Sequence, residues 1–131
     1  MCGIFAVLNN SHDNNYKKYN YFKSEFMKGQ HRGPEYSTYK NVMIKADFGF
    51  HRLAINGLNP NSHQPIIHDD IVLICNGEIY NYKELYTLMG IDPETDSDCE
   101  VIIHMYKYYG IKQTLQMLDG VFAFCLIDYR L

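Results

Sequence analysis

The second residue of this 131-residue chain is a cysteine that could do chemistry. Removal of Met1 would leave Cys2 with a thiol and a free α-amine on the same residue, and a thiolate is a strong nucleophile. The other interpretation of a lone cysteine is a small buried hydrophobe. Cys2 is therefore a candidate nucleophile by its position alone.

An amide and a glycine follow an apolar run in the stretch Cys75-Asn76-Gly77-Glu78. One interpretation is a strand-to-helix turn, in which Gly77 takes a positive φ and Asn81 caps the next helix. The alternative is an oxyanion site, because the Asn76 NH₂ and the Gly77 N–H could both donate to a developing negative charge. Both interpretations stay open on this stretch alone.

Arg52 and Asp98 are the third feature. Taken singly, Arg52 fits a surface strand and Asp98 fits the first turn of a helix, where a carboxylate favours the helix dipole. Taken together, an arginine can clamp a carboxylate with two hydrogen bonds and an aspartate can hold an ammonium. This pair is what a binding site for a free amino acid needs.

Composition and charge exclude several classes of protein. A chain with 47% hydrophobic and 21% charged residues is expected to fold as one domain with a modest core. A net charge of −3 without a basic stripe argues against a nucleic-acid partner. No apolar run approaches the length of a membrane span and no secretory signal is evident, which predicts a cytoplasmic chain with no membrane partner. The four cysteines lack metal-ligand spacing, so reduced thiols and no metal site are expected.

Strand and helix patterns alternate along the elements that must position these residues. The spacing of Tyr19, Phe22 and Phe26 predicts a helix that Gly29 ends in a left-handed conformation. Pro34 predicts a turn over residues 31–35, and residues 9–15 read as a loop. Strands are predicted over residues 2–8, 39–44, 47–55, 66–68, 71–75 and 121–129, the first of them buried on both faces.

Two capping boxes predict the starts of two further helices. Asn81 pairs with Glu84 and Ser97 pairs with Glu100, each placing an acceptor at the N-cap and a carboxylate three residues later. Glycines at positions 90 and 110 are expected to end these helices, and a further short helix is predicted over residues 111–118.

Six short blocks follow one another from the first residues to the last. They are Cys2-Gly3-Ile4-Phe5, His31-Arg32-Gly33-Pro34-Glu35, His51-Arg52-Leu53, Asn76-Gly77-Glu78-Ile79-Tyr80-Asn81, Ser97-Asp98-Cys99-Glu100-Val101 and Asp119-Gly120-Val121-Phe122-Ala123-Phe124. In this order they resemble the class II glutamine amidotransferase domain of asparagine synthetases, which is of the N-terminal-nucleophile hydrolase type.

The resemblance implies a fold and a set of roles. The fold is α+β, a four-layer α-β-β-α sandwich of antiparallel sheets, with residues 1–131 forming one amidotransferase domain that lacks its terminal strands. After loss of Met1, Cys2 would attack the side-chain amide of glutamine, and its α-amine, with a reference pKa of about 7.7–8.0, would serve as the base. Asn76 and Gly77 would hold the oxyanion. The resemblance also places Arg52 on the substrate α-carboxylate, and Asp98, helped by Glu78, on its α-amino group.

The resemblance further implies what the reaction needs. Glutamine is the expected ligand, and no cofactor is expected for its hydrolysis. ATP and magnesium would serve only a synthetase domain, whose Ser-Gly-Gly loop this sequence lacks, so a synthetase domain or subunit is the expected partner. The alternative is a catalytically inactive fragment or docking module that keeps the site residues by descent.

Overall fold

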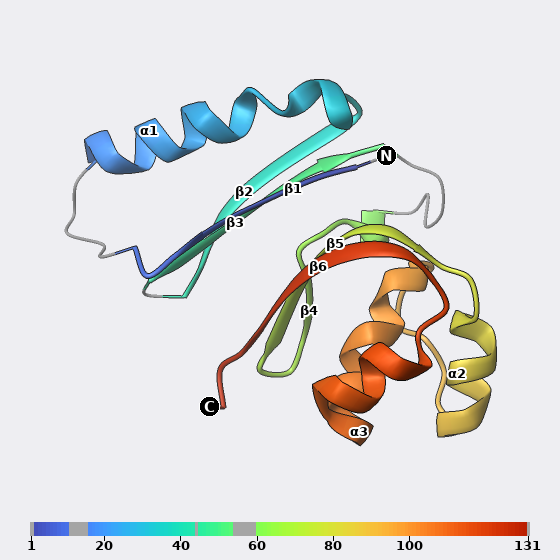
Figure 1. Ribbon diagram of the computed structural model, residues 1–131. Helices are drawn as coiled ribbons and strands as arrows, with labels where there is room; N and C mark the ends of the chain where they lie inside the picture. The colour runs from blue at the N-terminus through green and yellow to red at the C-terminus, as the bar shows by residue number, and fades with distance from the viewer. Residues whose placement is uncertain (1, 11–15, 44, 54–59, 131) are drawn as a thin grey trace. The chain divides into compact units, whose positions relative to one another are not determined.

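The computed structural model describes residues 2–10, 16–43, 45–53 and 60–130, which form three α-helices and two antiparallel three-stranded sheets. The chain divides into two compact units, Met1–Ala54 and Ile55–Leu131 (Figure 1). This mixed architecture of helices and antiparallel sheets agrees with the expected α+β class.

The first unit is a sheet with one long helix on one of its faces (Figure 1). The strands are β1 (Gly3–Leu8), β2 (Tyr36–Met43) and β3 (Ala46–Arg52), in the order β1-β3-β2. The helix is α1 (Tyr16–Met27), followed by the 3₁₀ helix η1 (Gln30–Arg32). Strand β3 therefore lies in the centre and pairs with both neighbours.

Aromatic packing attaches α1 to its sheet. The Phe26 ring stacks on the His51 ring with centroids 3.9 Å apart and also meets Phe5 and Tyr39. Gly49 lies beneath it, because a Cβ there would collide with the Phe26 ring. Phe26 is the helix residue that this contact buries, as the spacing of the aromatic residues predicts.

The second unit is a sheet whose one face is covered by two helices (Figure 1). Its strands are β4 (Ile66–His68), β5 (Ile71–Ile79) and β6 (Gly120–Asp128), in the order β4-β5-β6. The helices are α2 (Tyr82–Met89) and α3 (Val101–Met117), with 3₁₀ helices η2 (Pro60–Ser62) and η3 (Asp98–Glu100). The core between helices and sheet includes Leu73, Cys75, Ile79, Leu85, Ile102 and Met105.

Several predicted elements are confirmed. The hairpin of β4 and β5 turns at Asp69, and Gly90 ends α2 in a left-handed conformation with φ 67°. Gly110, with φ 74°, interrupts α3 before it resumes to Met117, so the short helix expected there is present. Of the predicted loop over residues 9–15 and strand over residues 47–55, the parts at 11–15 and 54–55 lie outside the described residues.

Four expectations about these elements are wrong. Strand β1 is not buried on both faces, because Ala6 and Leu8 are exposed. Gly29 has φ −84° rather than a left-handed conformation, and η1 follows it directly. A Cβ on Gly29 would lie 3.4 Å from the His51 ring, which is an ordinary van der Waals contact. The turn, one of the two interpretations of Asn76-Gly77, is wrong too, because β5 continues through both residues to Ile79.

The fourth concerns the capping boxes. Asn81 makes no capping hydrogen bond to α2. Its side chain instead donates to Met117 O at 2.9 Å and accepts from Asp119 N at 3.0 Å. Ser97 does cap η3 by accepting from Cys99 N, but Glu100 does not complete the box. The Asn81 side chain therefore joins the end of α3 to the residue before β6.

Candidate active site

The candidate nucleophile lies at the start of the first unit. Cys2 is half-buried one residue before β1, and its Sγ accepts a hydrogen bond from Leu53 N at 3.3 Å. The same sulfur lies 3.3 Å from Leu53 O. Leu53 acts through its main chain, so no side-chain motif could have identified it from the sequence.

Arg52 shares a sheet face with Cys2. Gly3 pairs with His51 in the antiparallel register of β1 and β3, so the next position places Cys2 opposite Arg52. Residues directly opposite in an antiparallel pair project on the same side. The first unit therefore brings the thiol and the guanidinium to one face, the face away from α1.

The block His31-Arg32-Gly33-Pro34-Glu35 holds the main chain of this region in place. Glu35 N donates to Arg52 O at 3.2 Å, and Pro34 forms a bridge with Arg52. Gly33 permits this close approach, because a Cβ there would collide with the main chain at His51. The block, to which the sequence assigned no role, thus positions Arg52.

His51 anchors the opposite face. Its Nε2 lies 2.8 Å from Phe26 O and its Nδ1 lies 2.7 Å from Ser37 Oγ. Because a carbonyl oxygen can only accept, the Nε2 must carry a proton and the Nδ1 then accepts from the Ser37 hydroxyl. His51 is therefore engaged in packing α1 against the sheet.

The second unit carries the four other candidate residues. Asn76, Gly77 and Glu78 lie in β5, and Asp98 begins η3. Asp98 Oδ2 accepts from Ile79 N at 2.6 Å, and the Cys99 thiol donates to Gly77 O at 3.7 Å. These contacts bring the start of η3 against β5 next to the Asn-Gly pair.

The Gly77 N–H points away from β6. Ile79 N donates to Asp98, whereas Tyr80 N donates to Asp119 O beside the start of β6. Successive residues of a strand direct their main-chain groups to alternate sides, so Gly77 N–H faces the same edge as Ile79 N–H. Strand β4 pairs with β5 only as far as Leu73, so it does not cover this edge at Gly77.

Gly77 takes a conformation that favours glycine. Its φ is +154°, and a Cβ would collide with Val121 O and with Phe122 in β6. The positive φ expected from the sequence is confirmed, although it occurs inside a strand. The Oδ1 of the neighbouring Asn76 is buried, and it has no hydrogen-bond partner among the described residues.

Asp98 is a buried carboxylate with another carboxylate nearby. Burial raises the pKa of Asp98, and the negative charge of Glu78 raises it further, while the hydrogen bond from Ile79 N opposes both effects. Asp98 is only 5% exposed to solvent. An ammonium placed here would relieve the cost of burying this charge.

Glu100 ties the loop before Asp98 to α3. Its carboxylate accepts from Glu94 N at 2.8 Å, Thr95 N at 2.7 Å and His104 Nε2 at 2.9 Å. Burial alone raises the pKa of Glu100, but the hydrogen bonds outweigh it and lower the pKa to about 2. The sequence assigned Glu100 only to a capping box, since the loop that it holds cannot be foreseen from helical spacing.

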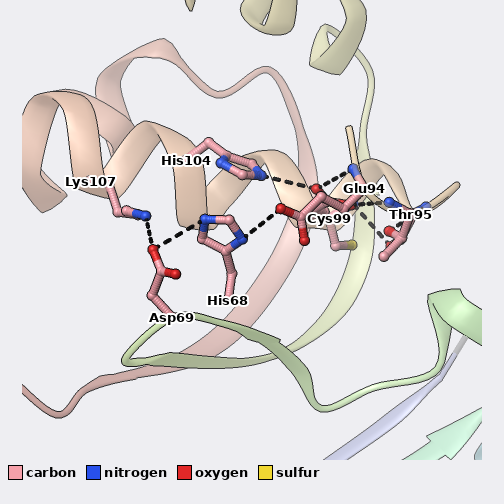
Figure 2. A network of polar contacts seen from close by, with 9 residues as sticks. His68, Asp69, Glu94, Thr95, Cys99, His104 and Lys107 are labelled. Atoms are coloured by element: carbon pink, nitrogen blue, oxygen red, sulfur yellow. Dashed lines mark hydrogen bonds and ion pairs between the residues drawn. The ribbon is translucent and has the colours of Figure 1, made fainter. Parts of the chain in front are cut away.

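A wider polar network includes His68, Asp69, Glu94, His104 and Lys107 (Figure 2). His68 lies between Glu94, 3.2 Å from its Nδ1, and Asp69, 3.5 Å from its Nε2. Lys107 donates to Asp69, and the rings of His68 and His104 meet edge to face at 4.7 Å. The network joins the β4–β5 turn, α3 and the loop that leads to Asp98.

Replacing Glu100 by glutamine should lower the free energy of unfolding by about 3 kcal/mol at pH 7, since the native pKa of about 2 lies below the ordinary 4.5. A depressed carboxylate pKa contributes stability above pH 4.5, and this contribution is lost as the pH falls toward 2. Urea denaturation at several pH values should therefore show the two proteins converging in acid. The control is Glu25→Gln, which removes an exposed pair with Lys28. A gap that persists unchanged at pH 2 would contradict this account.

Among the described residues, no group of three or more His, Cys, Asp or Glu side chains could hold a metal ion. No α-helix in that part of the chain is long and apolar enough to cross a membrane. All four cysteines are free thiols, and burial raises the pKa of Cys125.

Comparison with known proteins matches the whole chain to one family. A profile described as "Glutamine amidotransferase domain" covers residues 1–131. The chain is 44% identical over 108 residues to asparagine synthetase [glutamine-hydrolyzing] of Gallus gallus, covering 78% of this chain and 19% of the relative. It is 42% identical over 135 aligned residues to asparagine synthetase [glutamine-hydrolyzing] 1 of Arabidopsis thaliana, covering 99% of this chain and 22% of the relative.

The Homo sapiens asparagine synthetase [glutamine-hydrolyzing] is similar at 44% identity over 108 residues, again with 78% of this chain and 19% of the relative covered. The chain thus spans about a fifth of the length of the curated relatives that it matches. With one family profile covering residues 1–131, this chain belongs to the glutamine amidotransferase domain family.

Proposed function

We propose that this chain hydrolyses the side-chain amide of glutamine to glutamate and ammonia, with Cys2 as the nucleophile. The family match over residues 1–131 carries this proposal. The placement of Cys2 and Arg52 on one sheet face, and of Asp98 against β5 next to Gly77, supports it.

The reaction would begin with loss of Met1. The freed α-amine of Cys2, with a reference pKa of about 7.7–8.0, would take the thiol proton as the thiolate attacks the amide carbon of glutamine. The tetrahedral intermediate would carry its negative charge on the former amide oxygen. Its collapse would break the C–N bond, and the α-ammonium would return the proton to the departing ammonia. Water would then hydrolyse the glutamyl thioester, which releases glutamate and restores the thiol.

Gly77 and Asn76 would stabilise the oxyanion. The Gly77 N–H faces a strand edge that β4 does not cover at this point. The Asn76 Oδ1 can only accept hydrogen bonds, so the donor to the oxyanion would be the Asn76 NH₂. Removing one donor from an oxyanion site typically lowers the rate by about 10²–10³-fold.

Arg52 and Asp98 would hold the two ends of the amino-acid backbone. Arg52 would clamp the α-carboxylate, and Asp98 with Glu78 would receive the α-ammonium. The raised pKa of Asp98 supports this role, because burial and the Glu78 charge destabilise its carboxylate and a bound cation would stabilise it.

Ammonia released here would be used by a synthetase domain or subunit, where ATP and magnesium would act. The names of the relatives pair glutamine hydrolysis with asparagine synthesis, and this supports such a partner. Hydrolysis itself would need only glutamine and water. We also propose that residues 1–131 belong to one domain of the four-layer α-β-β-α type, which the family match and the helix-covered sheet in each unit support.

The direct test is to incubate the purified protein with glutamine and to measure glutamate and ammonia. Equal amounts of both products are expected from a protein whose intact mass shows that Met1 has been removed. A protein that retains Met1 and hydrolyses glutamine would contradict the α-amine as base. Absence of both products from a folded, Met1-free protein would contradict the proposed function.

Arg52→Lys should raise the KM for glutamine by about 10–100-fold, because an ammonium cannot reproduce the two-pronged contact of a guanidinium. Steady-state kinetics of glutamine hydrolysis would measure the change. The matched control is Arg130→Lys, since Arg130 makes an exposed two-pronged contact with Asp128 in β6. An unchanged KM in the Arg52 variant would remove Arg52 from the binding site.

A further inference from the structure

The side chain of Gln64 binds the main chain of β5 where β4 no longer pairs with it. Gln64 Nε2 donates to Cys75 O at 3.0 Å, and Cys75 N donates to Gln64 Oε1 at 2.5 Å. Gln64 is 6% exposed and Cys75 is 1% exposed, so both hydrogen bonds are buried. One side-chain amide thus satisfies both main-chain groups of a single strand residue.

This contact continues the ladder between β4 and β5. Ile66 pairs with Leu73, so the same register extended by two positions would place residue 64 opposite residue 75. In that register a strand residue exchanges two main-chain hydrogen bonds with its partner. The Gln64 side chain supplies the equivalent of this missing pair, although Gln64 lies outside β4.

The fixed residue immediately precedes Asn76 and Gly77. At Gly77 itself the Cys99 thiol donates to the main-chain oxygen, and two residues later Asp98 accepts from Ile79 N. Side chains therefore hold the edge of β5 at Cys75 and again at Ile79, on both sides of the Gly77 N–H. Without the Gln64 contact, this part of β5 would be held on its β6 side alone, so the Cys75 main chain and the nearby Gly77 N–H would be held less firmly.

We propose that Gln64 is a positioning residue for the oxyanion site, which it serves by holding the Cys75 main chain. This inference rests on the proposed glutamine hydrolysis for its kinetic consequence. Its structural part, the orientation of the Gly77 N–H, does not depend on that activity. Catalytic donors need placement within about half an ångström, and hydrogen bonds to their supporting main chain provide it.

Gln64→Met keeps the length of the side chain and removes both hydrogen bonds. It should lower kcat for glutamine by about 10–100-fold and leave KM within about twofold, because the oxyanion forms only after glutamine has bound. The matched control is Asn81→Ala, which removes a similar pair of bonds, to Met117 O and Asp119 N. The control should be destabilised with kcat nearly unchanged. Equal losses of kcat in both variants would overturn the proposal.

Alkylation of Cys2 by iodoacetamide measures the reactivity of the nucleophile without using the oxyanion site. This reaction forms a C–S bond and expels iodide without producing an oxyanion. Peptide mapping should therefore show the same Cys2 alkylation rate in Gln64→Met as in the parent protein. A rate that falls in parallel with kcat would indicate a general loss of structure and would overturn a specific positioning role.

Amide hydrogen exchange measured by NMR tests the contact between Gln64 and the Cys75 main chain even if the protein does not hydrolyse glutamine. Gln64→Glu, which keeps one acceptor for Cys75 N, provides a second variant if Gln64→Met does not fold. In Gln64→Met the Cys75 amide loses its acceptor and should exchange at least about tenfold faster. In either variant the Cys75 and Gly77 amide signals should shift, because the main chain there would change its orientation. Unchanged signals would overturn the proposal. An inactive parent protein would instead contradict the glutaminase function, and the exchange result would still decide the role of Gln64.

Discussion

Replacing Cys2 by alanine is expected to reduce glutamine hydrolysis by about 10⁴-fold or more, as loss of the nucleophile does in other enzymes with a covalent intermediate. The variant keeps a free α-amine at the same position, so the loss would report the thiol alone. The matched control is Cys125→Ala in β6, which removes another half-buried thiol and should leave the rate nearly unchanged. Release of glutamate from glutamine measures both.

Covalent labelling provides a second measurement of the same prediction. A diazoketone analogue of glutamine should label Cys2, free glutamine should compete with the label, and Cys2→Ala should abolish it. Such a result would indicate a formed glutamine pocket. Labelling spread evenly over Cys2, Cys75, Cys99 and Cys125 without protection by glutamine would instead favour an inactive fragment that keeps the site residues by descent.

Gly77→Ala should lower both stability and activity. The alanine Cβ would meet Val121 O and Phe122 in the neighbouring strand, and φ of +154° is a conformation that side chains rarely adopt. We expect a loss of about 2–4 kcal/mol in the free energy of unfolding. If β5 shifts to relieve the collision, the Gly77 N–H moves with it, and glutamine hydrolysis should fall by about 10²–10³-fold.

Gly90→Ala is the control that isolates the collision. Gly90 also has a positive φ, of 67°, but a Cβ there would meet nothing within 4 Å. Its cost should be about 1 kcal/mol, with unchanged kcat. Urea denaturation and steady-state kinetics of both variants would check the difference. A Gly77→Ala protein as stable and as active as Gly90→Ala would contradict both the strand geometry and the oxyanion role.

Side-chain patterns foretold the secondary structure in broad terms. Alternating or apolar runs located the six strands of the described residues, and the spacing of Tyr19, Phe22 and Phe26 located α1. These predictions succeed because the period of apolar residues must match the geometry of the element that buries them. The order of the strands within each sheet could not be obtained in this way, since neighbouring strands are chosen by packing across the whole unit.

Predictions about main-chain hydrogen bonds fared less well. Asn81 was expected to cap α2 and instead joins Met117 to Asp119. Gly29 was expected to be left-handed and instead has φ −84° before η1. An amide side chain can bind a main-chain N–H or C=O within its reach, and a carboxylate can bind a main-chain N–H. Only the folded chain decides which group that is.

By itself, the sequence determined the family and the six candidate residues, because ordered blocks of chemically distinctive residue types do not depend on knowing the fold. Tertiary structure alone decided what holds those residues: Leu53 N at the Cys2 sulfur, Ile79 N on Asp98, and Gln64 at the main chain before Asn76. Each of these contacts joins segments far apart in the sequence through a main-chain group, and every residue except proline carries the same main-chain donor and acceptor. The main-chain partner of each contact therefore cannot be recognised from its residue type, and it is identified only in the folded structure.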